Sequence, residues 1–196
     1  MSKVLTHMTM SLDGFIADPQ DGIDELFAWY GAGTVTVPTK SEDIPPFNVD
    51  DASAELLRGY LASGGALVAG RRLFDITNGW GDTHPMGVPV VVVTHHAPDD
   101  ADRWPRTTFV DNVTAGVEKA KEIAGDKDVT IASANIAAQA LDLGLVDEVH
   151  VSLVPVLMGE GIPYFASLGD APHRFEDPVV IPGTRATHLQ YAVKRD

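Results

Sequence analysis

Short apolar runs alternate along the chain with segments in which apolar residues follow helical spacing. The runs are rich in Val, Ile and Leu and have the length of strands. We predict strands at Lys3–Thr9, Ala66–Ala69, Pro89–Thr94, Asp128–Ala132, Glu148–Val154, Val179–Ile181 and Thr187–Val193. The valines of Pro89–Thr94 do not alternate with polar residues, which predicts a central strand covered on both faces. Thr187–Val193 does alternate, which is typical of an antiparallel or edge strand.

Three segments between these strands are predicted to be helices. The first follows Asp50, a residue type that caps helix N-termini, and ends at Gly64-Gly65. A second helix runs from about Thr114 to Gly125, and a third covers Ile136–Leu143. The alternation of strands and helices predicts an α/β fold with a mixed sheet.

The chain has no internal repeat, and its 196 residues suit one sizeable core better than two. We therefore expect a single domain over residues 1–196. Residues 31–48 are rich in Gly, Pro and polar side chains, which predicts a long excursion or a lid. The N-terminus lacks the apolar core of a signal peptide, so a cytoplasmic location is expected.

The balance of charge narrows the possible partners. The chain has 28 Asp and Glu against 14 Lys and Arg, a formal charge of -14. This acidity disfavours nucleic acid and anionic membranes as partners, because both would be repelled at long range. It still permits a small anionic ligand where positive charge is concentrated. With no cysteine in the chain, disulfides and thiolate metal sites are excluded, and no metal ligand set is recognisable.

Candidate chemistry lies at the ends of three predicted strands, where α/β sheets bind ligands. Gly70-Arg71-Arg72 offers close backbone approach and paired guanidinium groups for phosphate, or else begins a helix with solvated arginines. Thr94-His95-His96 offers a hydroxyl and imidazoles for phosphate or ribose, or else forms a solvated loop. The small residues of Ala132–Ile136 lead into a helix and suit an anion, although taken alone Ser133 or Asn135 is better explained as an N-cap.

Four motifs occur in one order and spacing that resembles a known family. They are MTMSLDGFIAD, GALVAGRRLFD, PVVVVTHH and ALDLGLVDEVHVSLVPVLMGEGIPYF. The chain resembles the dihydrofolate reductase-like family that includes the reductase half of the bifunctional riboflavin-biosynthesis deaminase–reductase, and is most similar to its stand-alone members. The resemblance covers about Lys3 to Val193. It implies a mixed, mostly parallel sheet of about eight strands flanked by helices, with NADPH as cofactor and a homodimer as the assembly.

The resemblance also implies where the cofactor would lie. Gly70 and Arg71 match the family's Gly-Arg pair at the cofactor, with Arg71 or Arg72 facing the 2′-phosphate. Thr94 and His95 match positions that line the adenosine phosphate and ribose. The positions matching the pyrophosphate loop are Ser133, Ala134, Asn135 and Ile136. Two segments match positions beside the nicotinamide. They are Asp13 to Ala17, and Gly159, Glu160 and Gly161.

One position departs from the family pattern. Many relatives have Gly-Gly in the pyrophosphate loop, where this chain has Ala132-Ser133. Because glycine permits backbone geometry that Ala and Ser tolerate poorly, we expect either a rearranged loop or weakened cofactor binding.

The substrate side has few candidates. Asp13 is the leading candidate for a general acid, although an Asp-Gly pair is also an ordinary turn. Asp24 is a weaker one. Trp29 and Tyr30 lie beside the predicted lid and are candidates to stack on a flat substrate.

These features favour an NADPH-dependent reductase that acts on a small heterocyclic or carbonyl compound, of the pteridine or pyrimidine kind. The alternative is a dimeric ligand-binding protein that keeps the fold without turnover. Authentic dihydrofolate reduction is disfavoured, because the substrate-binding helix of that enzyme is not recognisable.

Overall fold

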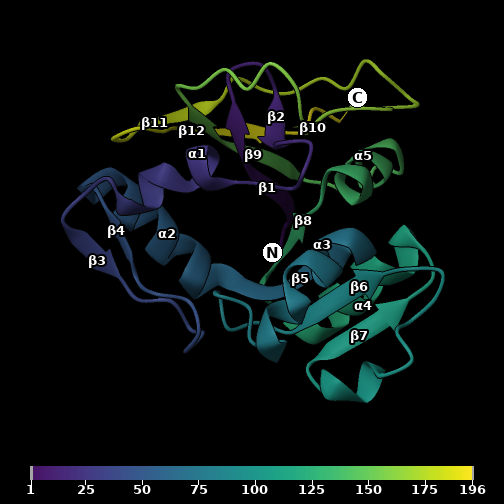
Figure 1. Ribbon diagram of the computed structural model, residues 1–196. Coiled ribbons are helices and arrows are strands. Elements are labelled where there is room, and N and C mark those ends of the chain that lie inside the picture. Colours follow the sequence, from purple (N-terminus) through teal and green to yellow (C-terminus); the bar gives the residue numbers. More distant parts are fainter. Residues whose placement is uncertain (1, 196) are drawn as a thin grey trace.

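The structure is a computed structural model that describes residues 2–195. Its centre is an eight-stranded sheet in the order β11-β12-β9-β1-β8-β5-β6-β7 (Figure 1). Six neighbouring strands from β9 to β7 run parallel, and β12 and β11 are antiparallel additions at one edge. The strands are β1 (Val4–Ser11), β5 (Gly64–Gly70), β6 (Val90–Val93), β7 (Thr107–Val110), β8 (Asp128–Ala132), β9 (Glu148–Val154), β11 (Val179–Pro182) and β12 (Thr187–Ala192). The predicted α/β fold with a mixed, mostly parallel sheet is confirmed.

The position of the valine strand differs from the prediction. β6 lies second from the edge, because β7, which was not predicted from the sequence, pairs with it on the outer side. Val90, Val91 and Val92 are nonetheless buried. Val91 packs with α4 (Val113–Ala124) on one face, and Val90 and Val92 pack with the Phe74 and Trp104 rings on the other. The unbroken apolar run therefore indicates that both faces of the strand are covered. It does not indicate a central position, because a strand next to the edge can also be covered on both faces.

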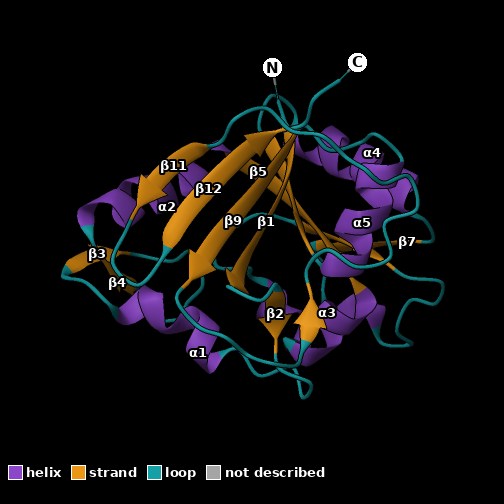
Figure 2. Cartoon of the chain, turned by 90° about the horizontal axis from the view of Figure 1, so that it is seen from above, coloured by secondary structure: helices purple, strands orange, loops and turns teal. Residues whose placement is uncertain are grey.

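The three predicted helices are present. α2 (Asp51–Ser63) begins at Asp50, whose carboxylate accepts the Ser53 N–H at 3.1 Å. α4 begins after Asn112, which caps it in the same way, and ends at Gly125 with φ 61°. α5 (Ala134–Asp142) follows β8. Buried contacts place α4 and α5 on one face of the sheet and α2 on the other, as Figure 2 shows.

Shorter elements fill the connections. They are β2 (Phe15–Ala17), α1 (Asp24–Phe27), α3 (Arg71–Ile76), β10 (Ile162–Pro163) and the 3-10 turns Ala28–Gly31, Asn78–Asp82 and Ala101–Arg103. Among residues 2–195, every helix is too short or too polar to cross a lipid bilayer.

Residues 31–48 were predicted to form a long excursion or a lid, and the lid is wrong. The segment contributes β3 (Val35–Val37), which pairs with β4 (Phe47–Val49) as an antiparallel hairpin. Val37 and Val49 are fully buried and pack with Leu26 and Leu57 of α1 and α2. Gly and Pro bound the hairpin, and its few apolar residues point inward. The segment is therefore part of a core and not a cover.

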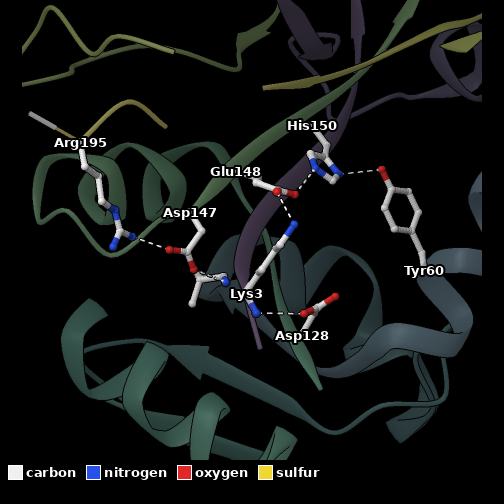
Figure 3. A network of polar contacts seen from close by, with 8 residues as sticks. Lys3, Tyr60, Asp128, Asp147, Glu148, His150 and Arg195 are labelled. Atoms are coloured by element: carbon white, nitrogen blue, oxygen red, sulfur yellow. Dashed lines mark hydrogen bonds and ion pairs between the residues drawn. The ribbon is translucent and has the colours of Figure 1, made fainter. Parts of the chain in front are cut away.

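The amino-terminal edge of the sheet is closed by ion pairs (Figure 3). The backbone N–H of Lys3 donates to Asp128 at 2.9 Å, and its ammonium group pairs with Glu148. The N–H of Val4 donates to Asp147, which also pairs with Arg195. These side chains pair with one another across the starts of β1, β8 and β9.

Candidate functional site

The carboxyl ends of the parallel strands β1, β5, β6 and β8 meet at one edge of the sheet, where β2, α1 and α3 also lie (Figure 2). Gly70 at the end of β5 touches the loop that follows β8. A Cβ atom on Gly70 would lie 2.9 Å from Ser133 Oγ and 3.3 Å from Ile136 Cγ1. A side chain at position 70 would press on Ser133 and Ile136, so the end of β5 packs tightly against the start of α5.

Arg71 faces the end of β6. Its Nε donates to Asp75 at 2.7 Å, and its Nη1 donates to the His96 carbonyl at 2.6 Å. The Thr94 hydroxyl donates to the same carbonyl at 2.9 Å, and His95 is exposed in the same loop. Arg71, Thr94 and His95 are therefore brought together at the end of β6. The hydrogen bonds to Asp75 and the His96 carbonyl hold the Arg71 guanidinium group in one orientation.

Arg72 points in another direction. Its Nε and Nη2 donate to the two carboxylate oxygens of Asp21, at 2.9 and 2.8 Å. Asp21 lies between β2 and α1, far from Arg72 in the sequence. The adjacent arginines are the first residues of α3. The two alternatives considered for them, a helix start and an anion-binding position, therefore apply to the same residues.

The loop after β8 adopts an ordinary backbone. Ser133 has φ −179°, an extended conformation open to any residue, and Ala134 begins α5. Among the described residues neither Ala132 nor Ser133 has a positive φ, so this loop does not use the backbone geometry that favours glycine. Within residues 2–195 the Ser133 hydroxyl makes no capping bond to α5. Ile136 is buried, and the exposed Asn135 accepts from Gln139 along the helix.

Asp13 holds the loop after β9. Its carboxylate accepts from the Ser11 hydroxyl at 2.6 Å, the Met158 N–H at 3.1 Å and the Gly159 N–H at 2.7 Å. These bonds, that from Ser11 foremost, lower the pKa of Asp13 to about 2. An ionised carboxylate with its oxygens occupied suits a positioning role and does not suit a general acid at neutral pH.

Gly161 fixes the other end of that loop against β2. It has φ 154°, and a Cβ atom on it would lie 2.2 Å from the Ala17 carbonyl oxygen. Ile162 pairs with Ala17 in the β2–β10 ribbon, while Glu160 is exposed between the two glycines. Ala17 and Gly159–Gly161, which the resemblance assigns to the nicotinamide side, thus lie side by side.

Replacing Gly161 with Ala is expected to lower the free energy of unfolding by about 1–2 kcal/mol, because the new methyl group collides with backbone. Urea unfolding measures this. Gly159→Ala is the matched control, since Gly159 also has a positive φ of 76°, yet a Cβ atom there meets nothing within 4 Å in the described chain. Equal losses in the two variants would contradict the proposed contact.

The aromatic candidates for the substrate side lie in a core. Trp29 is 1% exposed, and its Nε1 donates to the Thr9 hydroxyl at 3.2 Å. Its ring stacks on Tyr30 at 4.0 Å, which in turn stacks on Phe47 at 4.3 Å. Trp29 is thus unavailable to stack on a ligand without repacking, so the structure argues against that role. Asp24 is exposed in the first turn of α1.

Two groups of polar residues in the structure have no signal in the sequence. Asp21 was missed because nothing in its local sequence indicates a partner in α3. A second group, His7, Ser152, His188 and Ser53, forms a hydrogen-bonded chain beneath α2. Hydrogen-bonded partners in it are up to 145 residues apart in the sequence. In the described part of the chain, three or more His, Asp or Glu side chains nowhere gather as a metal site.

Comparison with known proteins finds one family over most of the chain. The profile of the RibD C-terminal domain matches residues 2–178. A protein of Shewanella sp. PV-4, provisionally named a riboflavin biosynthesis protein, is 21% identical with a TM-score of 0.73, and the match covers 98% of this chain and 99% of that one. No curated protein matches the sequence significantly.

Longer proteins are also similar in fold. Acinetobacter baumannii RibD is 16% identical with a TM-score of 0.65, over 99% of this chain and 58% of its own. A diaminohydroxyphosphoribosylaminopyrimidine deaminase/5-amino-6-(5-phosphoribosylamino)uracil reductase of Thermotoga maritima is 13% identical with a TM-score of 0.61, over 98% and 57%. The chain therefore spans a little over half of these two proteins.

Proposed function

The chain belongs to the family of the RibD C-terminal domain, and from this membership we propose that it is an NADPH-dependent reductase of a small heterocyclic or carbonyl compound. The observation that carries the proposal is Arg71, which the Asp75 carboxylate and the His96 carbonyl orient at the carboxyl edge of the sheet. On an acidic protein, a guanidinium held in this position is a local seat for a phosphate group.

The residues present fit the cofactor. The Cβ position of Gly70 lies against Ser133 Oγ and Ile136 Cγ1, so the ends of β5 and β8 pack side by side and the groups beside them can face one ligand. Arg71, Thr94 and His95 would hold the 2′-phosphate and ribose of the adenosine half. The amide groups at the start of α5 would hold the pyrophosphate. When bound, NADPH would supply the hydride from its nicotinamide ring.

The chain's own contribution to such a reaction is position. Asp13 holds the Met158 and Gly159 amides, and Gly161 packs on Ala17, so the nicotinamide side of the site is fixed from two strands. Accurate placement of the two reactants is a large part of the rate enhancement in such reactions. Because Asp13 is ionised, we assign it this positioning role and not proton donation.

Titration calorimetry with NADPH and NADH in parallel tests the proposal. We expect NADPH to bind with a Kd in the micromolar range and NADH to bind about tenfold or more weakly, since a lost charge-assisted phosphate contact costs about 1.5–3 kcal/mol. Absence of binding by both, or equal binding, would contradict the proposal.

We also propose a homodimer located in the cytoplasm. Support for the dimer comes from the edge strand β11, where Val179 and Val180 are 58% and 54% exposed. Exposed apolar side chains on an edge strand favour association with another chain.

A further inference from the structure

Arg72 and Asp21 form a two-point ion pair at the edge of the candidate cofactor site. Both carboxylate oxygens of Asp21 are used, by Nε at 2.9 Å and Nη2 at 2.8 Å. The Asp21 side chain is 20% exposed, whereas that of Arg72 is 66% exposed. The pair is thus open to solvent on the arginine side, where a charged ligand can compete for the guanidinium group.

The turn that carries Asp21 is built to present it. Asp18 accepts the N–H groups of Gln20 and Gly22, each at 2.7 Å, and its own N–H donates to the Gly22 carbonyl. Asp21 has φ 67°, a left-handed conformation that is uncommon for residues other than glycine, although Asp and Asn adopt it most easily. A Cβ atom on Gly22 would lie 2.3 Å from the Asp18 carboxylate. The carboxylate of Asp21 is therefore held in place before any ligand arrives.

The strand order fixes where this pair lies. The Asp21 turn belongs to the connection that leaves β1, and Arg72 follows β5 directly. In the sheet, β8 lies between β1 and β5. The ion pair therefore joins segments that follow the strands on either side of β8, and Gly70, two residues before Arg72, lies against Ser133 at the end of β8. Arg71 turns the other way, toward His96 after β6. The two adjacent arginines thus face different parts of the edge.

We propose that the Asp21–Arg72 pair is a latch over the pyrophosphate position of the cofactor, so that Arg72 binds the pyrophosphate only when it leaves Asp21. This rests on the proposed function, because it takes the loop at Ser133 as the pyrophosphate loop. A carboxylate in this place weakens the binding of an anion twice, by occupying the guanidinium group and by repelling the phosphates. Asp21 consequently sets cofactor affinity, while Arg71 discriminates between the two nicotinamide nucleotides.

The latch predicts equal changes in the Kd of NADPH and of NADH. NADPH and NADH share the pyrophosphate and differ in the 2′-phosphate. Asp21→Asn keeps the size of the side chain and tolerates the left-handed turn, but it removes the charge. We expect it to lower the Kd of both nucleotides by about threefold to fivefold, as the strength of exposed ion pairs implies, and to leave the ratio of the two constants unchanged. Arg72→Ala is expected to raise both constants by about tenfold.

Glu25→Gln is the matched control, because it removes one exposed carboxylate from α1, four residues away. Calorimetry of the three variants and the unaltered protein with both nucleotides is decisive. If Asp21→Asn binds no more tightly than Glu25→Gln, or if it changes the ratio of the NADPH and NADH constants, the latch is overturned. An unaltered protein that binds neither nucleotide would instead refute the proposed function, so the two failures are distinguishable.

Discussion

Acidification from about pH 7.5 to about pH 4.5 is expected to remove about 3 kcal/mol from the free energy of unfolding through His7 alone. The reason is a chain of polar side chains beneath α2, in which Ser53, Ser152 and His188 are buried and His7 is partly buried. His7 Nε2 lies 2.9 Å from Ser152 Oγ, which lies 2.9 Å from His188 Nδ1. His188 Nε2 lies 2.9 Å from Ser53 Oγ, and that hydroxyl donates to Asp50 at 2.8 Å.

The donors in this chain follow from its end point. An ionised Asp50 only accepts, so Ser53 donates to it and accepts from His188 Nε2–H. His188 Nδ1 then accepts from the Ser152 hydroxyl, which in turn accepts from His7 Nε2–H. Both imidazoles are neutral in this arrangement. Protonation of His188 would put a second N–H at Nδ1, where the chain needs an acceptor. Protonation of His7 would bring a positive charge into the same cluster.

The sign of the effect follows from the pKa of His7. Burial, together with the neighbouring imidazoles of His150 and His188, lowers this pKa to about 3 from the ordinary 6.5. Between these values the unfolded chain binds a proton that the folded protein does not, so stability is complete above pH 6.5 and falls as the pH falls toward 3. Burial also lowers the pKa of His188 and His150, and lowers that of His84 to about 4, which adds to the loss.

Urea unfolding at a series of pH values measures this dependence. His7→Gln keeps an N–H donor near Ser152 but does not titrate, so we expect a flatter decline of stability below pH 6.5 than in the unaltered protein. His95→Gln, at an exposed position after β6, is the control and should keep the original slope. A His7→Gln variant with that same slope would show that His7 is not the group responsible.

The elements that the sequence predicted correctly are those whose signal is local. The Asp50 cap, the spacing of Leu56 and Leu57, and the apolar runs of β8 and β9 each depend on neighbouring residues. β6 shows the limit of such signals, because burial on both faces is visible in the valine run but strand order is not. Residues 31–48 show a second limit. Val37 and Val49 are core residues only because the hairpin folds onto α1 and α2.

The candidate site divides in the same way. Gly70, Arg71, Thr94 and Ser133 were predictable, because parallel strands bring their carboxyl ends to one edge. The Asp21–Arg72 pair and the His7–Asp50 chain were not, since each joins residues from distant strands by side-chain geometry alone. The ionised state of Asp13 was hidden for the same reason. Its partners at Met158 and Gly159 are about 145 residues away.

Arg71→Ala is expected to weaken NADPH binding by about 10-fold to 100-fold and to leave NADH binding within about twofold. The loss follows from the charge-assisted hydrogen bonds that a fixed guanidinium group makes to a 2′-phosphate, which NADH lacks. Arg71 needs little reordering on binding, because Asp75 and the His96 carbonyl already hold it. Calorimetry with both nucleotides gives the two constants directly.

Arg103→Ala is the control that separates the loss of the Arg71 contact from the effect of a change in net charge. Arg103 is an exposed arginine paired with Asp100, so its removal subtracts the same charge away from the site. On a chain of net charge -14, any lost cation makes the whole surface somewhat more repulsive to anions. If Arg103→Ala weakens NADPH as much as Arg71→Ala does, the effect is one of net charge and Arg71 does not touch the 2′-phosphate. If Arg71→Ala weakens NADH equally, Arg71 binds the pyrophosphate, and the division of labour between the two arginines is reversed.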